Sequence, residues 1–343
     1  MNTIIKKIDV DKINEEAANN AFEEASELIL SGSLVAFPTE TVYGLGANAL
    51  DEAACAGIFA AKGRPGDNPL IVHISDLGML DDLCEITDTS QKLMDAFWPG
   101  ALTIIMQKKE KVPNIVTAGL TSVAVRLPAN PIAKLLIKTA NTPIAAPSAN
   151  LSGRPSPTSA EHVYEDFSGK IPLIIDGGQV DIGLESTVVD TTVENATILR
   201  PGGVGAESLA EVLGYEVKYE KIGDDEKPKS PGVKHKHYSP NANLQLANTW
   251  DEILRYRGEV LNRIGEEPLC VVLEEESRES YPEMQILKIS KYNDMETYAR
   301  NMYATLRYAD SKNYKDIIMQ TVPESGLGIP IMNRLKKAAS KKV

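Results

Sequence analysis

Short apolar runs alternate with segments of helical periodicity along residues 1–213, and this alternation constrains the fold more than any other feature. Apolar residues recur at helical spacing over 15–31, and the run 34–37 has the length of a buried strand that ends at Pro38. The other predicted strands are 70–74, 102–106, 123–127, 144–146, 173–175, 186–189 and 197–199, and the other helices are 51–61, 89–97, 130–140, 158–168 and 206–213. Short strands between helices predict an α/β fold with a twisted sheet of mixed strand direction.

The pattern stops after residue 213 and resumes near residue 242. Residues 221–241 are charged, contain three prolines and lack apolar periodicity, which is typical of an interdomain linker. Beyond them, we expect strands at 242–247, 268–274, 284–288 and 316–320, and helices at 250–263, 294–309 and 326–340. The sequence therefore predicts a first domain over 1–213, a linker over 214–241 and a smaller Rossmann-like α/β domain over 242–343.

The net charge of −12 is unevenly distributed. Residues 1–213 contain 15 basic and 28 acidic residues, whereas residues 214–343 contain 21 basic and 20 acidic residues. Tight nonspecific binding to nucleic acid depends on Lys and Arg at the phosphates, so an acidic first domain argues against it. A local basic pocket for a small anion remains compatible with this charge.

Cysteine usage and hydropathy indicate the compartment. Cys55, Cys84 and Cys270 are far apart in sequence, form no CxxC pair, and are interpreted as buried apolar residues in a reducing environment. No apolar run approaches the roughly 20 residues that a membrane helix needs. We therefore expect a cytoplasmic protein that does not cross a membrane.

Polar and glycine residues gather at the ends of predicted strands, where α/β proteins bind ligands. The segment 38–46 places hydroxyls directly after a strand and then two glycines, either as a tight turn or as a close approach of backbone to a ligand. The segment 145–155 presents Ser148 and Asn150, which offer hydrogen bonds to phosphate, to ribose or to a metal-bound water. A purely structural Pro/Asn loop is the alternative for this second segment.

Lys62 and Arg64 are two cations one residue apart in a turn that contains Gly63, Pro65 and Gly66. Both side chains can converge on one anion, because Lys supplies a point charge and Arg a planar fork suited to phosphate oxygens. A solvated basic turn is the alternative. Within the next predicted strand, His73 is either a satisfied core histidine or a functional residue.

A further group comprises Ser122, Arg126, the pair Ser186-Thr187, and Arg200 with the glycines after it. Arg126 lies among apolar strand residues, and a buried arginine needs an anionic partner. That partner is either a carboxylate of a ligand or one of the many acidic side chains of the chain itself. The sequence leaves both possibilities open.

Several common catalytic motifs are missing from the sequence. There is no GxxxxGK[ST] phosphate loop, HExxH, GxSxG or Cys/His metal spacing. His235 and His237 lie in the charged linker without a third ligand, which disfavours a metal site there.

Taken together, the segments PTETVYGLG, KGRP with NPL and a histidine, APSANLSGRPSPT, ESTVVD and ILRPGG resemble the YrdC-like family. The sequence is most similar to the two-domain threonylcarbamoyl-AMP synthases, which add a linker ending in HYSP and a small C-terminal domain. The resemblance covers nearly the whole chain, including the closing GLGIPIMNRLKKAAS. It implies a concave active-site face on the first domain.

The resemblance implies a nucleotidyltransferase reaction in which L-threonine, bicarbonate and ATP give threonylcarbamoyl-AMP and pyrophosphate, with Mg²⁺ accompanying ATP. The product would pass to a tRNA-threonylcarbamoyl transferase complex that modifies ANN-decoding tRNAs. The Lys-x-Arg and Ser-x-Asn signature falls on Lys62, Arg64, Ser148 and Asn150, the first two expected to be catalytic. By resemblance, threonine is bound by Thr41, His73, Arg126, Ala146 and Ser186. ATP is bound by Lys62, Arg64, Asn68, Ser122, Ser148, Asn150, Ser156, Arg200 and Tyr238.

One departure from the family lies in the linker. His235 and Lys236 stand where relatives more often have an aromatic residue and arginine, whereas Tyr238 keeps its place. We expect the linker to act as a lid over the adenylate. Two other functions compete with adenylate formation: RNA binding on the concave face, and carbamoyl transfer from carbamoyl-phosphate as in the related domain of hydrogenase-maturation proteins. The acidic first domain and the lack of acylphosphatase and zinc-finger modules disfavour them.

Overall fold

The computed structural model describes residues 2–220, 238–273 and 282–339 of the chain. Within these residues the chain forms two compact units. The first consists of residues 2–152, 156–181 and 185–220, and the second of residues 153–155, 182–184, 238–273 and 282–339. Two three-residue segments that lie far from the second unit in sequence thus belong to it in space.

The first unit is built on one mixed sheet that has ten strands in the described residues, in the order β1-β8-β2-β3-β7-β4-β6-β5-β9-β10. The strands are β1 (Ile4–Lys7), β2 (Val35–Pro38), β3 (Tyr43–Asn48), β4 (Ile71–His73), β5 (Leu102–Gln107), β6 (Ser122–Arg126), β7 (Ile144–Ala145), β8 (Leu173–Asp176), β9 (Thr187–Asp190) and β10 (Thr197–Arg200). The sheet contains both parallel pairs, such as β4 with β6, and antiparallel pairs, such as β4 with β7. The predicted mixed sheet is confirmed.

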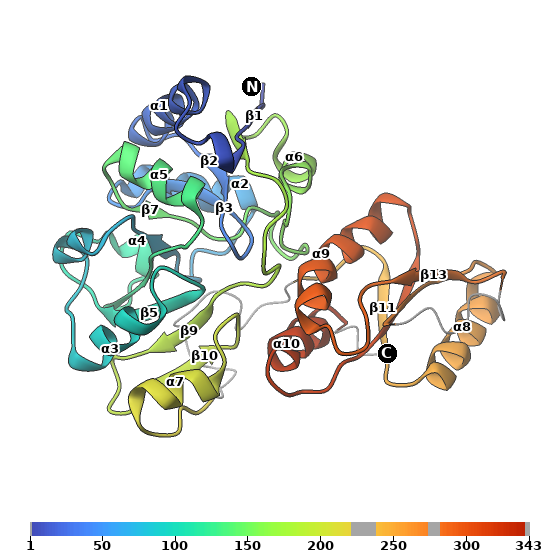
Figure 1. The fold of residues 1–343 in the computed structure, drawn as a ribbon. Coiled ribbons are helices and arrows are strands. Elements are labelled where there is room, and N and C mark those ends of the chain that lie inside the picture. Colours follow the sequence, from blue (N-terminus) through green and yellow to red (C-terminus); the bar gives the residue numbers. More distant parts are fainter. Residues whose placement is uncertain (1, 221–237, 274–281, 340–343) are drawn as a thin grey trace. The chain divides into compact units, whose positions relative to one another are not determined.

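Helices cover both faces of this sheet. They are α1 (Glu16–Leu30), α2 (Glu52–Lys62), α3 (Asp88–Phe97), α4 (Asn114–Thr117), α5 (Pro131–Ala140), α6 (Ala160–Phe167) and α7 (Ala206–Leu213), with 3-10 turns η1 (Val10–Lys12) and η2 (Leu77–Asp82). Figure 1 shows α1 and α5 side by side over one face. The predicted helices and strands are confirmed to within two residues at each end.

Strand side chains alternate between two hydrophobic cores. In β2, Val35 and Phe37 pack with the core beneath α1 and α5, whereas Ala36 packs with the larger core on the opposite face. Successive side chains of a strand point to opposite faces, so a continuous apolar run fits a strand with helices on both sides. The run 35–37 is therefore apolar without interruption because β2 is buried on both faces of the sheet.

The segment 38–46 is not a ligand-facing turn throughout, because its second half forms β3. A Cβ on Gly46 would lie 2.7 Å from a Phe37 ring carbon and 2.8 Å from Ile144. The missing side chain therefore allows β3 to pack against its own neighbours, which accounts for this glycine by packing within the sheet. The sequence pattern also did not predict β1, α4 or the two 3-10 turns.

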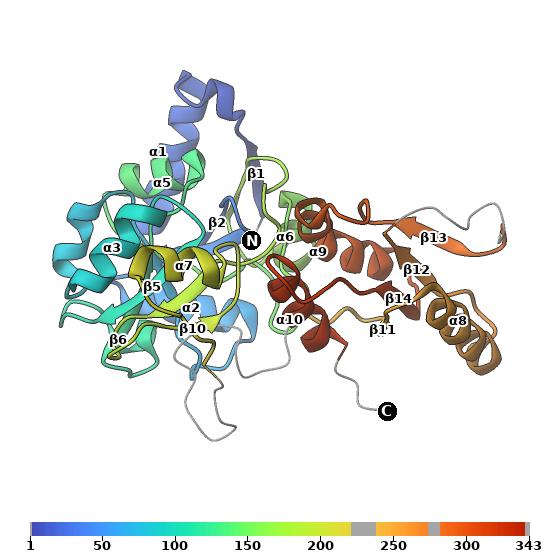
Figure 2. The same cartoon turned by 60° about the horizontal axis from the view of Figure 1, so that its bottom comes forward.

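The second unit has a parallel sheet in the order β11-β14-β12-β13, formed by β11 (Asn243–Ala247), β12 (Leu269–Val272), β13 (Gln285–Lys288) and β14 (Asp316–Gln320). Its helices are α8 (Trp250–Ile264), α9 (Met295–Ser311) and α10 (Gly328–Ala338). Figures 1 and 2 show this sheet between α8 on one side and α9 with α10 on the other. The predicted Rossmann-like arrangement is confirmed.

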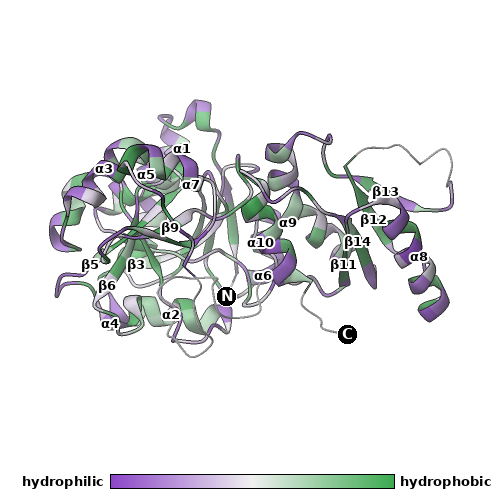
Figure 3. Cartoon of the chain, turned by 90° about the horizontal axis from the view of Figure 1, so that it is seen from below, coloured by the Kyte–Doolittle hydropathy of each residue, from purple (hydrophilic) through white to green (hydrophobic). Residues whose placement is uncertain are grey.

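Figure 3 shows apolar strands inside each unit and hydrophilic residues along the outward sides of helices such as α1 and α8. None of the helices in the described part of the chain combines the length and apolar character that a membrane crossing needs.

Candidate active site

Lys62 is the last residue of α2, and its position follows from the two ends of that helix. The Asp51 side chain accepts hydrogen bonds from the amides of Ala53 and Ala54 and so starts the helix, and Gly63 ends it with a φ of 60°. Lys62 is buried, and its Nζ donates to the carbonyl oxygen of Ser148 at 2.5 Å and to that of Asn150. The structure therefore brings together both halves of the Lys-x-Arg and Ser-x-Asn signature.

The loop that carries Ser148 is held from several sides. Ser148 forms a β-bridge with Gly44, and its Oγ donates to Oδ1 of Asn150 at 2.5 Å. The amide of Ser152 donates to the carbonyl oxygen of Lys62 at 2.9 Å. These contacts order the loop, so its polar groups are presented by a rigid element.

Arg64 and Asn68 form the turn that leads into β4. Arg64 Nη2 donates to the carbonyl oxygens of Asn68 at 3.3 Å and Pro69 at 3.1 Å. Asn68 is buried, and among the described residues its Oδ1 has no hydrogen-bond partner. A buried acceptor without a donor is costly, so this atom is suited to a donor on a ligand.

The register of β4 and β6 separates two groups of candidate residues. His73 pairs with Arg126 at one end of these parallel strands, whereas Asn68 precedes β4 and Ser122 begins β6 at the other. Ser122 and Arg126 are four residues apart on one strand, or about 13 Å at the usual rise. His73 and Arg126, predicted for threonine, therefore lie at one end of the strand pair, and Asn68 and Ser122, predicted for ATP, lie at the other.

Arg126 is 3% exposed and forms three hydrogen bonds with residues that the structure describes. Its Nη2 lies 2.6 Å from Glu40 Oε1, Nη1 donates to Thr41 Oγ1 at 2.8 Å, and Nε donates to the carbonyl oxygen of Gly100 at 3.1 Å. Of the two partners that the sequence left open, the internal acid is present. A guanidinium has five N–H donors, so one on Nη1 and one on Nη2 remain for a ligand.

The charges of this cluster follow from burial and from the ion pair. Burial alone would raise the pKa of Glu40, but the charge and hydrogen bond of Arg126 outweigh it and hold that pKa below its ordinary value. Burial, together with the charge of Arg126, lowers the pKa of His73 to about 3. His73 is thus neutral near pH 7, and its Nδ1 lies 3.2 Å from the carbonyl oxygen of Ile71. A group this weakly basic is suited to binding rather than to general-base catalysis.

The hydroxyl of Thr41 keeps one hydrogen-bonding group for a ligand. It accepts from Arg126 Nη1 at 2.8 Å and lies 2.7 Å from Thr39 Oγ1, a contact in which either hydroxyl can be the donor. If Thr41 donates to Thr39, one of its lone pairs remains, and if it accepts from Thr39, its own proton remains.

Ser186 and Arg200 meet beside β5 and β9. Arg200 Nε and Nη2 both donate to the carbonyl oxygen of Ser186, at 3.1 and 2.9 Å, and Nη2 also donates to its Oγ. Ser186 Oγ lies 2.7 Å from Thr103 Oγ1. Arg200, a predicted ATP residue, is therefore anchored on Ser186, a predicted threonine residue.

Two further candidates lie on neighbouring parts of the first unit. Ser156 Oγ donates to the buried Glu185 Oε1 at 2.6 Å. Ala146 follows β7, and its amide donates to the carbonyl oxygen of Ile71 at 2.9 Å, which places it beside β4. Within the described residues no group of three His, Cys, Asp or Glu could hold a metal ion.

Tyr238 belongs to the second unit. Its ring stacks on Tyr303 of α9 with centroids 5.5 Å apart, and the guanidinium of Arg334 on α10 lies 5.6 Å from its centroid. The predicted role of Tyr238 at ATP stays a prediction. His235 and Lys236, where the linker departs from the family, lie outside the described residues.

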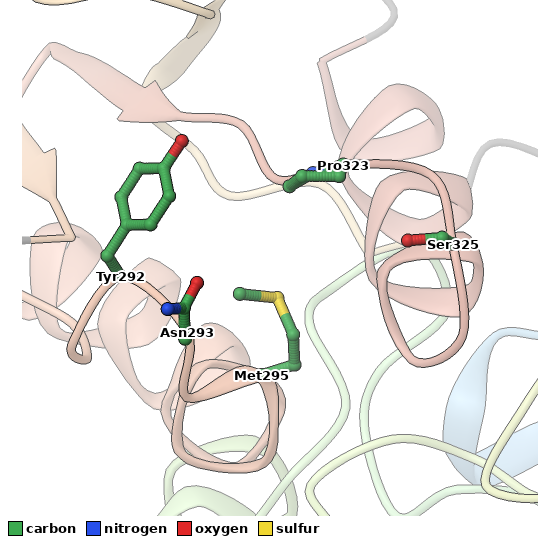
Figure 4. Close-up of a pocket in the computed structure, with 5 residues that line it drawn as sticks. All are labelled: Tyr292, Asn293, Met295, Pro323 and Ser325. Atoms are coloured by element: carbon green, nitrogen blue, oxygen red, sulfur yellow. The ribbon is translucent and has the colours of Figure 1, made fainter.

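The second unit has a pocket after β13 and β14 (Figure 4). Its lining residues are Tyr292, Asn293, Met295, Pro323 and Ser325. None of the five carries a charge, so this pocket lacks the cationic groups that phosphate transfer needs. The chemistry is better supplied by the first unit.

Sequence reasoning missed Glu40, Thr39, Thr103 and Glu185 as parts of the cluster. A signal for Glu40 existed: it stands between two threonines directly after a strand, and Arg126 required an acid. Which acid that would be depends on which loop lies beside β6, and this is a tertiary property.

The fold and the site define a two-unit α/β protein whose first unit holds buried cations and hydroxyls suited to a small anionic ligand. A family model described as "Telomere recombination", for Sua5, YciO and YrdC proteins, matches residues 27–202. A second model, described as the C-terminal domain of threonylcarbamoyl-AMP synthase, matches residues 204–340.

The chain is 46% identical to the threonylcarbamoyl-AMP synthase of Pyrococcus abyssi over 93% of this chain and 94% of the relative. It is 43% identical to that of Bacillus subtilis over 97% of each. A crystal structure of P. abyssi Sua5 complexed with L-threonine matches with a TM-score of 0.87 and 43% identity, covering 98% of this chain and 97% of that one.

The chain belongs to the threonylcarbamoyl-AMP synthase family. The predicted family and the predicted enzyme class, a nucleotidyltransferase, are thereby confirmed.

Proposed function

We propose that this protein converts L-threonine, bicarbonate and ATP into threonylcarbamoyl-AMP and pyrophosphate. The proposal rests on the geometry of Arg126. Beyond its three hydrogen bonds to described residues, its guanidinium has two N–H donors that can bind a carboxylate beside the neutral His73. The relative of known structure was crystallised with L-threonine, which supports the same substrate here.

In this proposal threonine lies at the His73 and Arg126 end of the strand pair. Its carboxylate pairs with Arg126, and its hydroxyl hydrogen-bonds to the remaining group of Thr41. Ser186 and the backbone at Ala146 complete the predicted contacts. A site that hydrogen-bonds a substrate hydroxyl rejects analogues without it, because its own polar group would be left unpaired.

ATP lies toward the other group of candidates. Arg64, Asn68 and Ser122 stand at the opposite end of β4 and β6, and Asn68 Oδ1, which has no partner in the described part of the chain, supports a ligand donor there. Lys62 keeps the Ser148–Asn150 loop in place and adds positive charge near the phosphates. Ser156, Arg200 and Tyr238 remain proposed ATP contacts.

The chemistry needs no covalent intermediate on the protein. The threonine amine combines with bicarbonate to give an N-carboxylate and water, and one oxygen of that carboxylate attacks the α-phosphorus. The bond from the α-phosphorus to the bridging oxygen breaks, and pyrophosphate leaves with that oxygen and its electron pair. Such transfers depend on positioning and charge neutralisation, which buried Lys and Arg residues supply.

Mg²⁺ is proposed as a companion of ATP. This ion is usually bound through substrate phosphates and few protein groups, which fits a described chain without a cluster of metal-ligating side chains. The hydroxyl of Ser148 and the amide of Asn150 would hold water on such an ion. When bound, Mg²⁺ would offset triphosphate charge.

We propose that the adenylate passes to a tRNA-threonylcarbamoyl transferase complex, and that the chain works in the cytoplasm. RNA binding by this chain and carbamoyl transfer from carbamoyl-phosphate remain the competing functions. A filter-binding assay at increasing salt tests the first, and replacing ATP and bicarbonate by carbamoyl-phosphate tests the second.

The deciding experiment measures pyrophosphate release from ATP with and without L-threonine and bicarbonate. We expect release to require both, and to fall at least about 100-fold in Arg64→Ala, because a phosphate-neutralising group is removed. Release that ignored threonine, or survived this substitution, would contradict the proposed function. Lys138→Ala, at an exposed position on α5, is the control.

A further inference from the structure

Glu40 is a buried acid that lies against two residues of the proposed threonine site without belonging to either half of the Lys-x-Arg and Ser-x-Asn signature. It stands in the loop between β2 and β3, and the carboxylate is the internal partner of Arg126, at 2.6 Å from Nη2. An acid beside the group that is to bind a carboxylate requires an explanation, since it neutralises the charge that would attract the ligand.

The second oxygen of Glu40 ties this pair to a rigid element. Oε2 accepts from the amide of Asn130 at 3.3 Å, and Asn130 is the N-cap of α5, whose side chain accepts from Ile132 and Ala133. Glu40 therefore connects the β2–β3 loop, β6 and the start of α5. Its carboxylate cannot rotate without breaking one of these contacts.

The three acceptors around Arg126 come from two separate loops. On the β2–β3 loop, Glu40 accepts from Nη2 and Thr41 accepts from Nη1. The carbonyl oxygen of Gly100, in a second loop, accepts from Nε. Together they fix the plane and rotation of the guanidinium. The two donors that remain, one on each terminal nitrogen, then point in a direction that the protein has set in advance.

We propose that Glu40 is a positioning residue for the substrate carboxylate, which it serves by orienting Arg126. This inference rests on the proposed function. Glu40 lowers the net charge of the site and so makes recognition depend on directed N–H donors rather than on charge alone, which favours a correctly placed carboxylate over other small anions.

The test compares wild type, Glu40→Gln and Glu40→Asp by calorimetric titration with L-threonine, with L-threonine amide, and separately with ATP. In Glu40→Gln we expect the Kd for L-threonine to rise at least about 10-fold, because the partner of a buried pair is lost and Arg126 reorients. The Kd for ATP should change by less than about 3-fold, since the contacts of Glu40 with Arg126 and Asn130 include no proposed ATP residue.

L-Threonine amide separates positioning from general structural damage. The amide lacks the carboxylate, so its weak binding should differ by less than about 3-fold between wild type and Glu40→Gln. Equal losses for threonine, its amide and ATP would mean that Glu40 is only structural and would overturn the inference. Unchanged threonine affinity would overturn it as well.

Glu40→Asp covers the case in which Glu40→Gln does not fold, because it keeps the charge and shortens the side chain by one methylene. We expect a smaller rise in the Kd for L-threonine with ATP affinity retained, and no rise would reject the inference. Glu267→Gln, which alters the partner of Arg257 in the second unit at 2.5 Å, is the matched control. If wild type itself does not bind L-threonine, the proposed function fails instead.

Discussion

Lys62 Nζ lies 2.5 Å from the carbonyl oxygen of Ser148, so a buried ammonium at the end of one helix holds a loop 86 residues further along the chain. Asn150 supplies a second carbonyl acceptor to the same ammonium. The signature residues are therefore part of one structural unit as well as a proposed phosphate site, and changes in it will affect both stability and chemistry.

Replacing Lys62 by methionine keeps the apolar stem and removes the ammonium. Two carbonyl oxygens lose their donor, so we expect the free energy of unfolding to fall by about 1–3 kcal/mol in urea titration. Pyrophosphate release should fall at least about 100-fold. Lys138→Met, at an exposed site, should change neither, and activity of Lys62→Met within about 3-fold of wild type would refute the role.

Ser156 donates to Glu185 at 2.6 Å, and we expect Ser156→Ala to raise the KM for ATP about 3- to 10-fold. The KM for threonine should change little, because Ser156 is proposed to contact only ATP. Glu185→Gln keeps an acceptor oxygen for Ser156, so its effect should be smaller. The measurement is initial rate against each substrate, and a shift confined to threonine would contradict the assignment.

Thr41 accepts from Arg126 and shares a hydrogen bond with Thr39, which leaves one hydrogen-bonding group of its hydroxyl for the ligand. Thr41→Val removes that group and should raise the KM for L-threonine about 10-fold or more. Thr41→Ser keeps the hydroxyl and should remain within about 3-fold of wild type. For L-2-aminobutyrate, which lacks the threonine hydroxyl, Thr41→Val should raise the KM by a smaller factor than for L-threonine. An equal increase for both substrates would show that Thr41 does not bind the threonine hydroxyl.

The pKa of His73 falls from its ordinary value of 6.5 to about 3 in the folded chain, because the imidazole is buried beside Arg126. Between these values the unfolded state binds a proton that the folded state does not, so stability falls as pH falls. One such group lowers the free energy of unfolding by about 1.4 kcal/mol for each pH unit of acidification between the two pKa values. Urea titrations between about pH 6.5 and about pH 5 should therefore show a steeper loss in wild type than in His73→Asn, and equal slopes would reject the shift.

The same neutral histidine predicts a flat threonine affinity over this range. A binding step that required protonated His73 would strengthen as pH falls through 6.5, and the geometry gives no reason for that. Calorimetric titration of L-threonine at each pH checks this separately from stability.

Most of the fold could be predicted because local patterns decide it. The helix 15–31 has clear helical periodicity, the strand 34–37 is a short apolar run, and a glycine separates them; the structure has both elements. β3 could not be predicted, since its glycines have low strand propensity and only its neighbours in the sheet supply the pairing. β1 is an exposed edge strand whose pairing with β8 spans most of the first unit.

The site divides in the same way. An anion site could be predicted from the residue types alone. Lys62 and Arg64 offer two positive charges in one turn, and Ser148 and Asn150 offer hydrogen-bonding groups in one loop. Their mutual contact, and the choice of Glu40 as the partner of Arg126, depend on the sheet order that places distant loops side by side.

By itself, the sequence determined the α/β class, two units of different character and the family, because apolar periodicity and motif order are written along the chain. Only the tertiary structure decided that Lys62 binds carbonyl groups of the Ser148–Asn150 loop, that Arg126 is already paired, and that His73 is neutral. Each of these depends on burial and on partners remote in sequence, and neither composition nor spacing specifies which groups burial will bring together.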